Sequence, residues 1–429
     1  QYAAVYDELQ GGFGAAPKFP QPARLLFLLQ DGEAASVDMA LNTLNRMAAG
    51  GIHDQLGGGF HRYATDFEWR VPHFEKMLYD QALIARAYLF AWRVTRDDRY
   101  AATARGILDF ALRDMRNGQG GFYSALSADS PVAGAADAHM EEGAYYTWHW
   151  KELTAVLGDE LRDWAVMRYG VTPQGEAGGE VAGKNVLHRV IDSAGLAQQF
   201  GVDRVEADRR NARLDAVLLA ARNRRPAVPV DDKVVAAWNG YMITTLALAG
   251  RLLDEPRYIE AAVATAGCVL DKLRDAESGV LYRDWRAGVR GVPGFCADYA
   301  GIAEGLLTLY RVTADRDWLD RARSLTAAML ERFLDDTHGG FYSTPADTEL
   351  WLREKEAVDG ATLAPNGVAL QVLLQLAAIT GNPDYLEQAW RTAAWAGAQL
   401  QDAPSAMPYT LIVWPELPAV RPDRSSSKD

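Results

Sequence analysis

The sequence carries an internal repeat that limits which folds are open to it. A glycine pair followed by phenylalanine occurs at Gly11-Gly12-Phe13, Gly58-Gly59-Phe60, Gly120-Gly121-Phe122 and Gly339-Gly340-Phe341, with a weaker copy at Gly279-Val280-Leu281. Neighbouring copies lie roughly 50–60 residues apart, or a multiple of that length plus an insertion. A period of this length with glycine punctuation predicts stacked supersecondary units.

The segments between the glycine motifs have the spacing of amphipathic helices. Apolar residues recur three and four positions apart, and residue types that favour helices dominate. Helix-stop and N-cap residues mark hairpin turns, as in Thr95-Arg96-Asp97-Asp98 and Thr380-Gly381-Asn382-Pro383-Asp384. About twelve helices in six hairpins can close into a ring. We therefore predict an all-α fold, an (α/α)6 toroid or barrel with short β-hairpins on one rim.

The pattern also predicts the extent of the domain. We expect one barrel domain over residues 1–415, with an insertion near residues 170–207, where the helical periodicity is lost. Residues 416–429 are expected to form a disordered tail. The strand-like pieces 122–124 and 144–148 are expected to pair with each other. The longer loops should gather on one side of the ring and form the mouth of a cavity.

Charge and cysteine content narrow the possible partners. The net charge of -13 repels phosphate backbones, and no basic stripe is present, so we expect no nucleic-acid partner. No apolar run approaches the length of a membrane span, so we expect no membrane association. Cys268 and Cys296 form neither a CxxC pair nor a zinc spacing. They indicate two structural thiols in a reducing compartment, and we predict a cytoplasmic protein.

The stretch from Gly50 to Lys76 is where we expect chemistry. It holds three of the chain's seven histidines, His53, His61 and His73. Acidic residues and aromatic rings lie among them. Loops rich in polar and ionisable residues are common places for function. The alternative is that these side chains satisfy backbone groups where the chain crosses itself tightly.

Several motifs together resemble one known family. They are the segments 11–20 (GGFGAAPKFP), 51–63 (GIHDQLGGGFHRY), 71–82 (VPHFEKMLYDQA) and 183–188 (GKNVLH), and 231–234 (DDKV) with 238–240 (WNG). The chain resembles the thioredoxin-domain-containing, spermatogenesis-associated protein family over residues 10–400. The resemblance implies a barrel similar to those of N-acylglucosamine 2-epimerases and six-hairpin glycosidases. It also implies that the family's N-terminal thioredoxin-like domain is absent here and is a possible partner.

The first functional hypothesis is sugar epimerisation or isomerisation. Moving a proton at a carbon next to a carbonyl needs an acid and a base, and histidine suits both roles near neutral pH. His53, His61 and His73 are the candidates, with Asp54 or Glu75 as orienting partners. Arg62 would polarise a substrate oxygen.

The second hypothesis is glycoside hydrolysis, which needs two carboxyl groups on either side of a glycosidic bond. The candidates all lie near predicted loops or helix starts: Asp54, Glu75, Glu142, Asp232, Asp298 and Asp359. An acidic residue at a helix start also stabilises the helix dipole without any catalytic role.

The third hypothesis is a non-catalytic module that binds glycans or proteins beside a thioredoxin-like domain. Aromatic rings suit the apolar faces of sugars and also fill cores, so they fit every hypothesis. The predicted catalytic residues are His53, Asp54, His61, His73, Glu75 and Asp232. The predicted substrate-binding residues are Arg62, Trp69, Tyr79, Glu142, Tyr146, Trp238, Asn239, Asp298, Tyr299 and Asp359. The histidine spacings match no familiar ligand motif, so we expect no metal and no cofactor.

Overall fold

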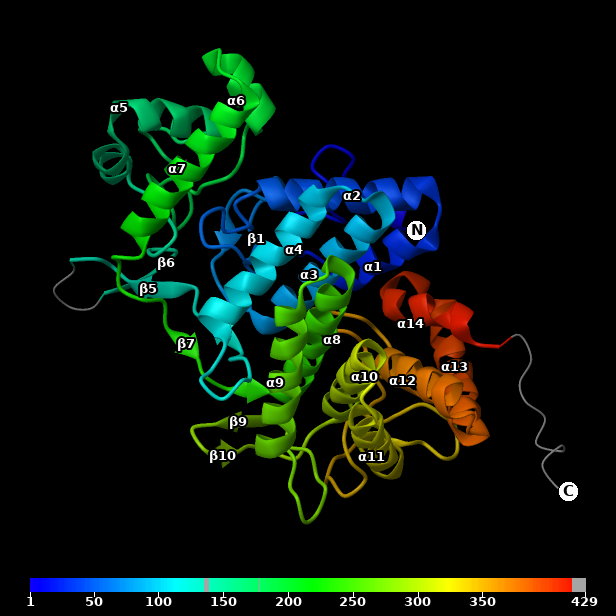
Figure 1. Cartoon of the computed structure of the whole chain (residues 1–429). Coiled ribbons are helices and arrows are strands. Elements are labelled where there is room, and N and C mark those ends of the chain that lie inside the picture. The colour runs from blue at the N-terminus through cyan, green and yellow to red at the C-terminus, as the bar shows by residue number, and fades with distance from the viewer. Residues whose placement is uncertain (135–138, 177, 419–429) are drawn as a thin grey trace, which may run out of the picture.

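A computed structural model describes residues 1–134, 139–176 and 178–418. Within these ranges it contains fourteen α-helices. Six of them form an inner ring: α1 (Pro22–Asp31), α3 (Leu78–Thr95), α8 (Ala236–Leu253), α10 (Cys296–Thr313), α12 (Pro365–Thr380) and α14 (Pro408–Val413). Each inner helix contacts the next one, and α14 contacts α1, so the ring closes (Figure 1). The predicted all-α toroid is therefore confirmed.

Five outer helices pack behind the ring. They are α2 (Ala34–Ala49), α4 (Asp98–Phe110), α9 (Pro256–Lys272), α11 (Arg316–Phe333) and α13 (Pro383–Asp402). Each contacts the inner helix that precedes it in the chain, as an antiparallel hairpin requires. The inner helices α8 and α10 approach closely because glycines face each other there. A Cβ atom at Gly240 would lie 2.4 Å from the carbonyl carbon of Gly301.

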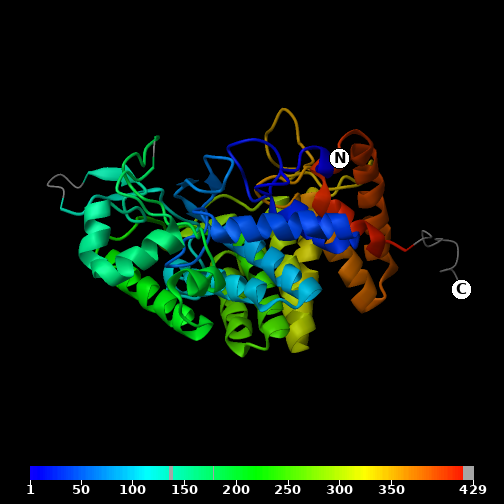
Figure 2. The same cartoon turned by 90° about the horizontal axis from the view of Figure 1, so that it is seen from above.

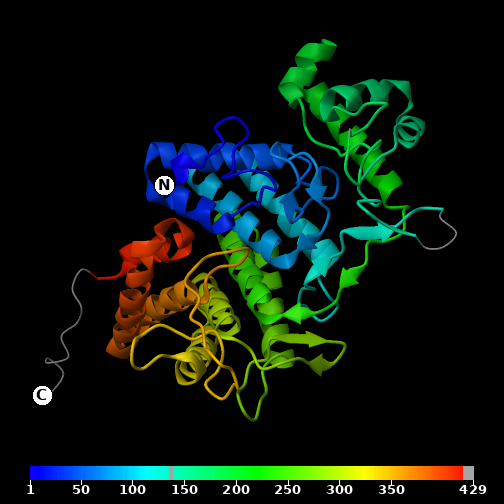
Figure 3. The same cartoon turned by 180° about the vertical axis from the view of Figure 1, so that it is seen from behind.

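A second group of helices stands beside the ring, as Figures 1 and 3 show. It consists of α5 (Trp150–Tyr169), α6 (Ser193–Phe200) and α7 (Arg204–Arg222). These helices contact one another and bury a core of their own around Trp148, Trp164 and Leu214. The side group therefore has its own apolar interior, separate from the core of the ring.

Short strands join the loops at the rim. One sheet has the order β3 (Lys76–Met77), β4 (Ala125–Leu126), β7 (Val230–Asp231), and another the order β10 (Val289–Arg290), β9 (Asp284–Arg286), β8 (Val234–Val235). Two hairpins pair β1 (Tyr63–Ala64) with β2 (Pro72–His73), and β5 (Asp129–Pro131) with β6 (Met140–Glu142). The expected pairing of 122–124 with 144–148 is wrong. Phe122 bridges Arg116, and Trp148 bridges Asn185.

The glycine motifs are tight loops that each lead into an inner helix. Side-chain amides from the next inner helix hold three of them. Phe60 N donates to Gln81 Oε1 at 2.8 Å, Phe122 N to Asn239 Oδ1 at 2.8 Å, and Phe341 N to Asn366 Oδ1 at 2.7 Å. Each amide nitrogen donates back to the same phenylalanine's carbonyl oxygen. In the weaker copy, Leu281 N donates to the hydroxyl of Tyr299 at 2.9 Å. The repeat is thus a backbone clamp on the first turn of the inner helices α3, α8, α10 and α12.

The long loops lie on one side of the ring (Figure 2). This is the side where the inner helices begin. No helix in the described part of the chain combines the length and apolar character needed to cross a membrane. Most of the predicted tail lies outside the described residues, which end at residue 418; within them, Trp414–Glu416 form a short 3-10 helix, η4. Both cysteines, Cys268 and Cys296, are buried and free.

Candidate functional site

The loop that carries Asp54 is a buried junction held by ion pairs and hydrogen bonds. Lys76 Nζ lies 2.9 Å from Asp54 Oδ2, and Arg222 Nη1, from α7, lies 2.6 Å from Oδ1. The Leu56 and Gly57 amides also donate to Oδ1. Burial alone would raise the pKa of Asp54, but the charges of Arg222 and Lys76 outweigh it and hold the pKa well below its ordinary value. Asp54 therefore links the side helices to the ring as a permanent anion.

The same loop design occurs twice more. Lys76 Nζ also donates to Gly58 O at 2.8 Å. In the loop before α1, Lys18 Nζ contacts Asp7 Oδ2 at 2.6 Å and Gly11 O at 2.8 Å. In the loop before α12, Lys355 Nζ contacts Asp335 Oδ2 at 2.6 Å and Gly339 O at 2.8 Å. A lysine that bridges an aspartate and a glycine carbonyl is thus a repeated device for closing these loops.

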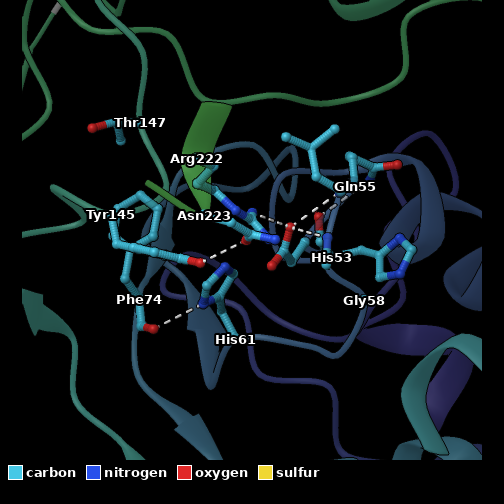
Figure 4. Close-up of polar contacts among 12 residues, drawn as sticks. His53, Gln55, Gly58, His61, Phe74, Tyr145, Thr147, Arg222 and Asn223 are labelled. Atoms are coloured by element: carbon cyan, nitrogen blue, oxygen red, sulfur yellow. Dashed lines mark hydrogen bonds and ion pairs between the residues drawn. The ribbon is translucent and has the colours of Figure 1, made fainter. Parts of the chain in front are cut away.

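His53 and His61 lie inside this junction. His53 Nδ1 is 3.1 Å from Ala48 O, and His61 Nδ1 is 2.9 Å from Phe74 O. Figure 4 shows His61 bonded to Phe74, with Arg222 reaching into the same loop. Burial lowers the pKa of His53 to about 4 and that of His61 well below its ordinary value. The void that they line has a volume of only about 20 Å³, which leaves no room for a sugar.

A much larger cavity opens at the mouth of the ring. It has a volume of about 390 Å³ and lies where α1, α3 and α14 begin. We name it the mouth cavity. Its lining consists of Phe19, Pro20, Gln21, Pro22, Ala23, Arg24, Arg62, Tyr79, Asp80, Asp359, Gly360, Ala361, Ser405, Ala406 and Pro408. The structure thus brings three predicted site residues, Arg62, Tyr79 and Asp359, into one cavity.

Polar atoms without partners gather in this lining. Among the described residues, Gln21 Oε1, Arg24 Nε, Arg62 Nε and Asp80 Oδ2 are buried and have no hydrogen-bond partner. Gln21 also has a left-handed backbone (φ 48°), which is uncommon for a residue other than glycine. Buried polar groups are normally paired, and strain persists mostly at functional sites. These groups would find partners in a bound polar ligand.

Burial favours the protonated form of both carboxyl groups that line the mouth cavity. Asp80 is 4% exposed, and burial raises its pKa well above the ordinary value. Burial also raises the pKa of Asp359 to about 7, against hydrogen bonds from the Ala364 and Tyr409 amides at 2.8 and 2.7 Å. Burial therefore favours the protonated form of Asp80, whereas Asp359 titrates near neutral pH.

A polar chain inside the ring positions α14 and, through it, Asp359. Arg86 Nη1 lies 3.0 Å from Glu304 Oε1, and the Tyr409 hydroxyl donates to the same oxygen at 2.8 Å. The Tyr409 amide is the group that holds Asp359 Oδ2. Helices α3, α10 and α14 are thus tied together directly beneath the mouth cavity.

His73 lies in a separate cavity between the loops and the side helices. This side cavity has a volume of about 550 Å³ and includes Tyr63, Glu142 and Glu180. His73 Nδ1 is 2.6 Å from Glu142 Oε1, and its Nε2 is 3.9 Å from Glu75 Oε2. Glu75 Oε2 also pairs with Arg62 Nη1 at 3.0 Å. A chain of ionisable groups therefore runs from the side cavity to the mouth cavity.

The other predicted site residues are placed apart from both carboxyls. Trp69 is fully buried, and its indole donates to Gln10 O at 2.9 Å. Tyr146 stacks on Phe74 beside His61. Asn239 and Tyr299 are fully buried in the clamps, and Asp298 accepts the Ala237 and Phe295 amides. Asp232 forms an ion pair with Arg286. Trp238 lies in another cavity beside Tyr79.

No protein-family model matches the chain. Human spermatogenesis-associated protein 20 is 38% identical over 94% of this chain and 55% of its own length, and the mouse protein is 36% identical over the same shares. An uncharacterised protein from Caenorhabditis elegans is 31% identical over 95% of this chain and 59% of its own length.

The chain is a homologue of spermatogenesis-associated protein 20. The resemblance seen in the sequence motifs is therefore confirmed. The chain spans about half the length of these curated relatives. The activity and partners of the longer proteins do not follow from this match.

Solved structures share the fold at low identity. A cellobiose 2-epimerase from Bacillus thermoamylovorans has a TM-score of 0.56 at 10% identity, covering 91% of this chain and 81% of the epimerase. A D-mannose isomerase also has a TM-score of 0.56, at 12% identity, with 92% and 83% covered. A GH76 α-mannanase from Bacteroides thetaiotaomicron has a TM-score of 0.52 at 10% identity, with 94% and 81% covered. These likenesses establish the toroid and nothing about the reaction.

Sequence reasoning missed Asp80, Gln21 and Arg24. Asp80 belongs to the 71–82 motif, and Gln21 and Arg24 come shortly after the 11–20 motif. The motifs therefore pointed to these parts of the chain without identifying the three residues. It also missed Arg222, whose partner Asp54 is 168 positions away. Among the described residues, no group of histidine, cysteine, aspartate and glutamate side chains is arranged to hold a metal ion.

Proposed function

We propose that the chain is a carbohydrate-directed enzyme that uses Asp80 and Asp359 as its acid–base pair. The observation that carries this proposal is that two carboxyl groups with raised pKa values line one cavity at the mouth of a toroid. Two titratable groups whose environments give them different pKa values are the usual acid and base in acid–base catalysis. The structural relatives are sugar-processing enzymes, which agrees with this substrate class.

The reaction that fits best is epimerisation or isomerisation of a sugar. Asp359, with a pKa of about 7, is a stronger base than an ordinary aspartate and would take the proton next to the carbonyl. Burial favours the protonated form of Asp80. Asp80 would therefore donate a proton to the opposite face of the reacting carbon or to the carbonyl oxygen. Arg62 and Tyr79 line the same cavity and would bind substrate oxygens.

This assignment differs from the histidine mechanism expected from the sequence. No histidine is among the residues that line the mouth cavity. His73 communicates with it only through Glu75 and Arg62. We therefore propose that His73 and Glu75 position Arg62, and that His53, Asp54 and His61 hold the loop in shape.

Glycoside hydrolysis is the second candidate. It is favoured by the protonated state of Asp80, because hydrolysis begins with proton donation to the glycosidic oxygen. Asp359 in its ionised form would then activate water or act as the nucleophile. A binding role without turnover, cooperation with a thioredoxin-like domain, and a cytoplasmic location stay predictions.

Proton NMR in D2O with a panel of reducing sugars, N-acylated amino sugars and short glycosides tests the proposal. Loss of the signal from the proton at C2 indicates epimerisation or isomerisation, and new anomeric signals without exchange indicate hydrolysis. Asp80→Asn and Asp359→Asn should each lower the rate by about 10²–10⁴-fold. Asp320→Asn, on the exposed face of α11, is the matched control and should keep the wild-type rate. Turnover that survives both cavity substitutions would refute the assignment.

The pH dependence provides an independent test. Asp359 must lose its proton to act as a base, so kcat/KM should rise as the pH passes about 7. Asp80 must keep its proton, so the rate should fall again at a pH above its raised pKa. A profile whose lower limb lies near pH 4, the range of an ordinary aspartate, would exclude Asp359 as the base.

A further inference from the structure

A second cavity occupies the other half of the ring mouth. Its volume is about 410 Å³, close to that of the mouth cavity, and both lie in the range of small-molecule sites. The mouth cavity lies at the starts of α1, α3 and α14, whereas this one lies at the starts of α8, α10 and α12. We name it the second compartment. The two cavities therefore occupy complementary sectors of one rim.

The two cavities share a wall. Tyr79 lines the mouth cavity and Trp238 the second compartment, and their rings meet edge to face with centroids 4.9 Å apart. On the other side, one loop supplies Asp359 to the mouth cavity and Thr362 to the second compartment. A ligand longer than one ring could therefore pass from one cavity to the other over this wall.

The lining of the second compartment suits a sugar. Trp238, Tyr241 and Phe295 provide aromatic surfaces. Ser343 Oγ and Thr344 Oγ1 are buried and have no hydrogen-bond partner among the described residues. Unpaired hydroxyls beside aromatic rings combine the hydrogen bonding and the flat apolar contact that a sugar ring needs.

Charge restricts the kind of sugar. The compartment is lined by Glu354 and Glu356 and by one arginine, Arg283. Arg283 also forms an ion pair with Asp298, with Nη1 and Oδ2 3.6 Å apart. An excess of acidic groups repels the carboxylate of a uronic acid and accepts hydrogen bonds from hydroxyl groups.

An exposed apolar run borders the second compartment. Leu350 and Leu352 line it, and they are 52% and 71% exposed. Trp351, between them, is fully exposed. Exposed apolar side chains gathered at the edge of a cavity are typical of binding grooves. They would extend the contact surface for a chain-like ligand beyond the cavity itself.

We infer that the second compartment binds a further unit of an oligosaccharide, so that the substrate is a neutral sugar chain of two or more units. This inference rests on the proposed function, because the reacting unit is placed beside Asp80 and Asp359. The adjoining unit would stack against Trp238 and bond to the hydroxyls of Ser343 and Thr344.

Calorimetric titration with β-1,4-linked glucose and mannose oligomers of increasing length tests the inference. For the wild-type protein, the Kd should fall by about tenfold or more from the monosaccharide to the trisaccharide of one series. Ala297→Trp fills the second compartment from the first turn of α10. It should abolish this dependence on length and leave monosaccharide binding unchanged. Ala361→Trp, which fills the mouth cavity, is the matched variant and should weaken binding of every length.

A second variant keeps the test valid if Ala297→Trp fails to fold. Leu352→Ala removes an exposed side chain, so it leaves the core intact, and it should weaken only the longer oligomers, by a few-fold. Equal affinity for all lengths in the wild-type protein, or unchanged length dependence in Ala297→Trp, would overturn the inference while the proposed function stands. Absence of binding and turnover with every sugar would overturn both.

Discussion

Two acidic sites a short distance apart in the sequence illustrate opposite uses of a buried carboxylate. Asp54 has two cationic partners and two amide donors, and its pKa is depressed. Asp80 has a buried oxygen that finds no hydrogen-bond partner in the described part of the chain, and its pKa is raised. Asp54 faces a void of about 20 Å³, whereas Asp80 faces a cavity of about 390 Å³.

The difference separates groups that hold the fold from groups that await a ligand. A buried carboxylate with every bond satisfied contributes to one fixed arrangement of the chain. A buried carboxyl with an unpaired oxygen destabilises the folded state, because its lost hydrogen bonds to water are not replaced. The density of ionisable residues in the loop from Gly50 to Lys76 therefore marks a structural junction, whereas the unpaired carboxyl of Asp80 lines a cavity large enough for a ligand.

The largest expected effect comes from breaking the Asp54 junction. Asp54→Asn leaves Lys76 and Arg222 buried without a counter-charge, so the free energy of unfolding should fall by about 3–5 kcal/mol. Urea denaturation followed by circular dichroism measures this loss. Asp335, in the equivalent loop, pairs with Lys355 and with the exposed His338, and among the described residues no arginine forms an ion pair with it. Asp335→Asn should therefore cost less, about 1–3 kcal/mol. Equal losses would show that Arg222 adds nothing at Asp54.

A smaller effect is expected from the backbone clamps. Asn366→Ala leaves the amide and carbonyl groups of the buried Phe341 without partners, which should cost about 1–3 kcal/mol of unfolding free energy. Asn239→Ala, in the clamp on Phe122, should cost a similar amount. The double substitution should cost the sum, because the clamps lie on different helices. A loss from one substitution and none from the other would contradict the repeat.

The architecture could be predicted from the sequence because its signals are local. The predicted hairpin turns at 95–98 and 380–384 join α3 to α4 and α12 to α13, because a turn signal depends only on neighbours along the chain. The glycine motifs are visible in the sequence because their positive φ angles and close contacts require glycine, although the side chains that hold three of these loops come from inner helices. Gly59 illustrates this constraint, as it has a φ of 77° and a Cβ there would lie 2.4 Å from Phe110.

The site could be predicted only in part, because it depends on which partners a side chain finds. Arg62, Tyr79 and Asp359 were expected at the site and share the mouth cavity, although no local pattern places Asp359 beside Tyr79. Asp54 and Asp80 are the same residue type near similar motifs. Arg222, which neutralises Asp54, comes from the side helices, and no periodicity in the sequence predicts that contact.

The central claim is that the mouth cavity is built for a ligand and the Asp54 junction for the fold. The most direct test is the free energy of unfolding of Asp80→Asn, which needs no substrate. Because the folded-state pKa of Asp80 is raised, the contribution of Asp80 to the stability of the wild-type protein falls as the pH rises above about 4, the pKa of an aspartate in the unfolded chain. Asparagine does not titrate, so at pH 7 the variant should be as stable as the wild type or more stable, by up to about 2 kcal/mol. A loss of the size expected for Asp54→Asn would contradict the account, because it would make Asp80 part of the structural framework.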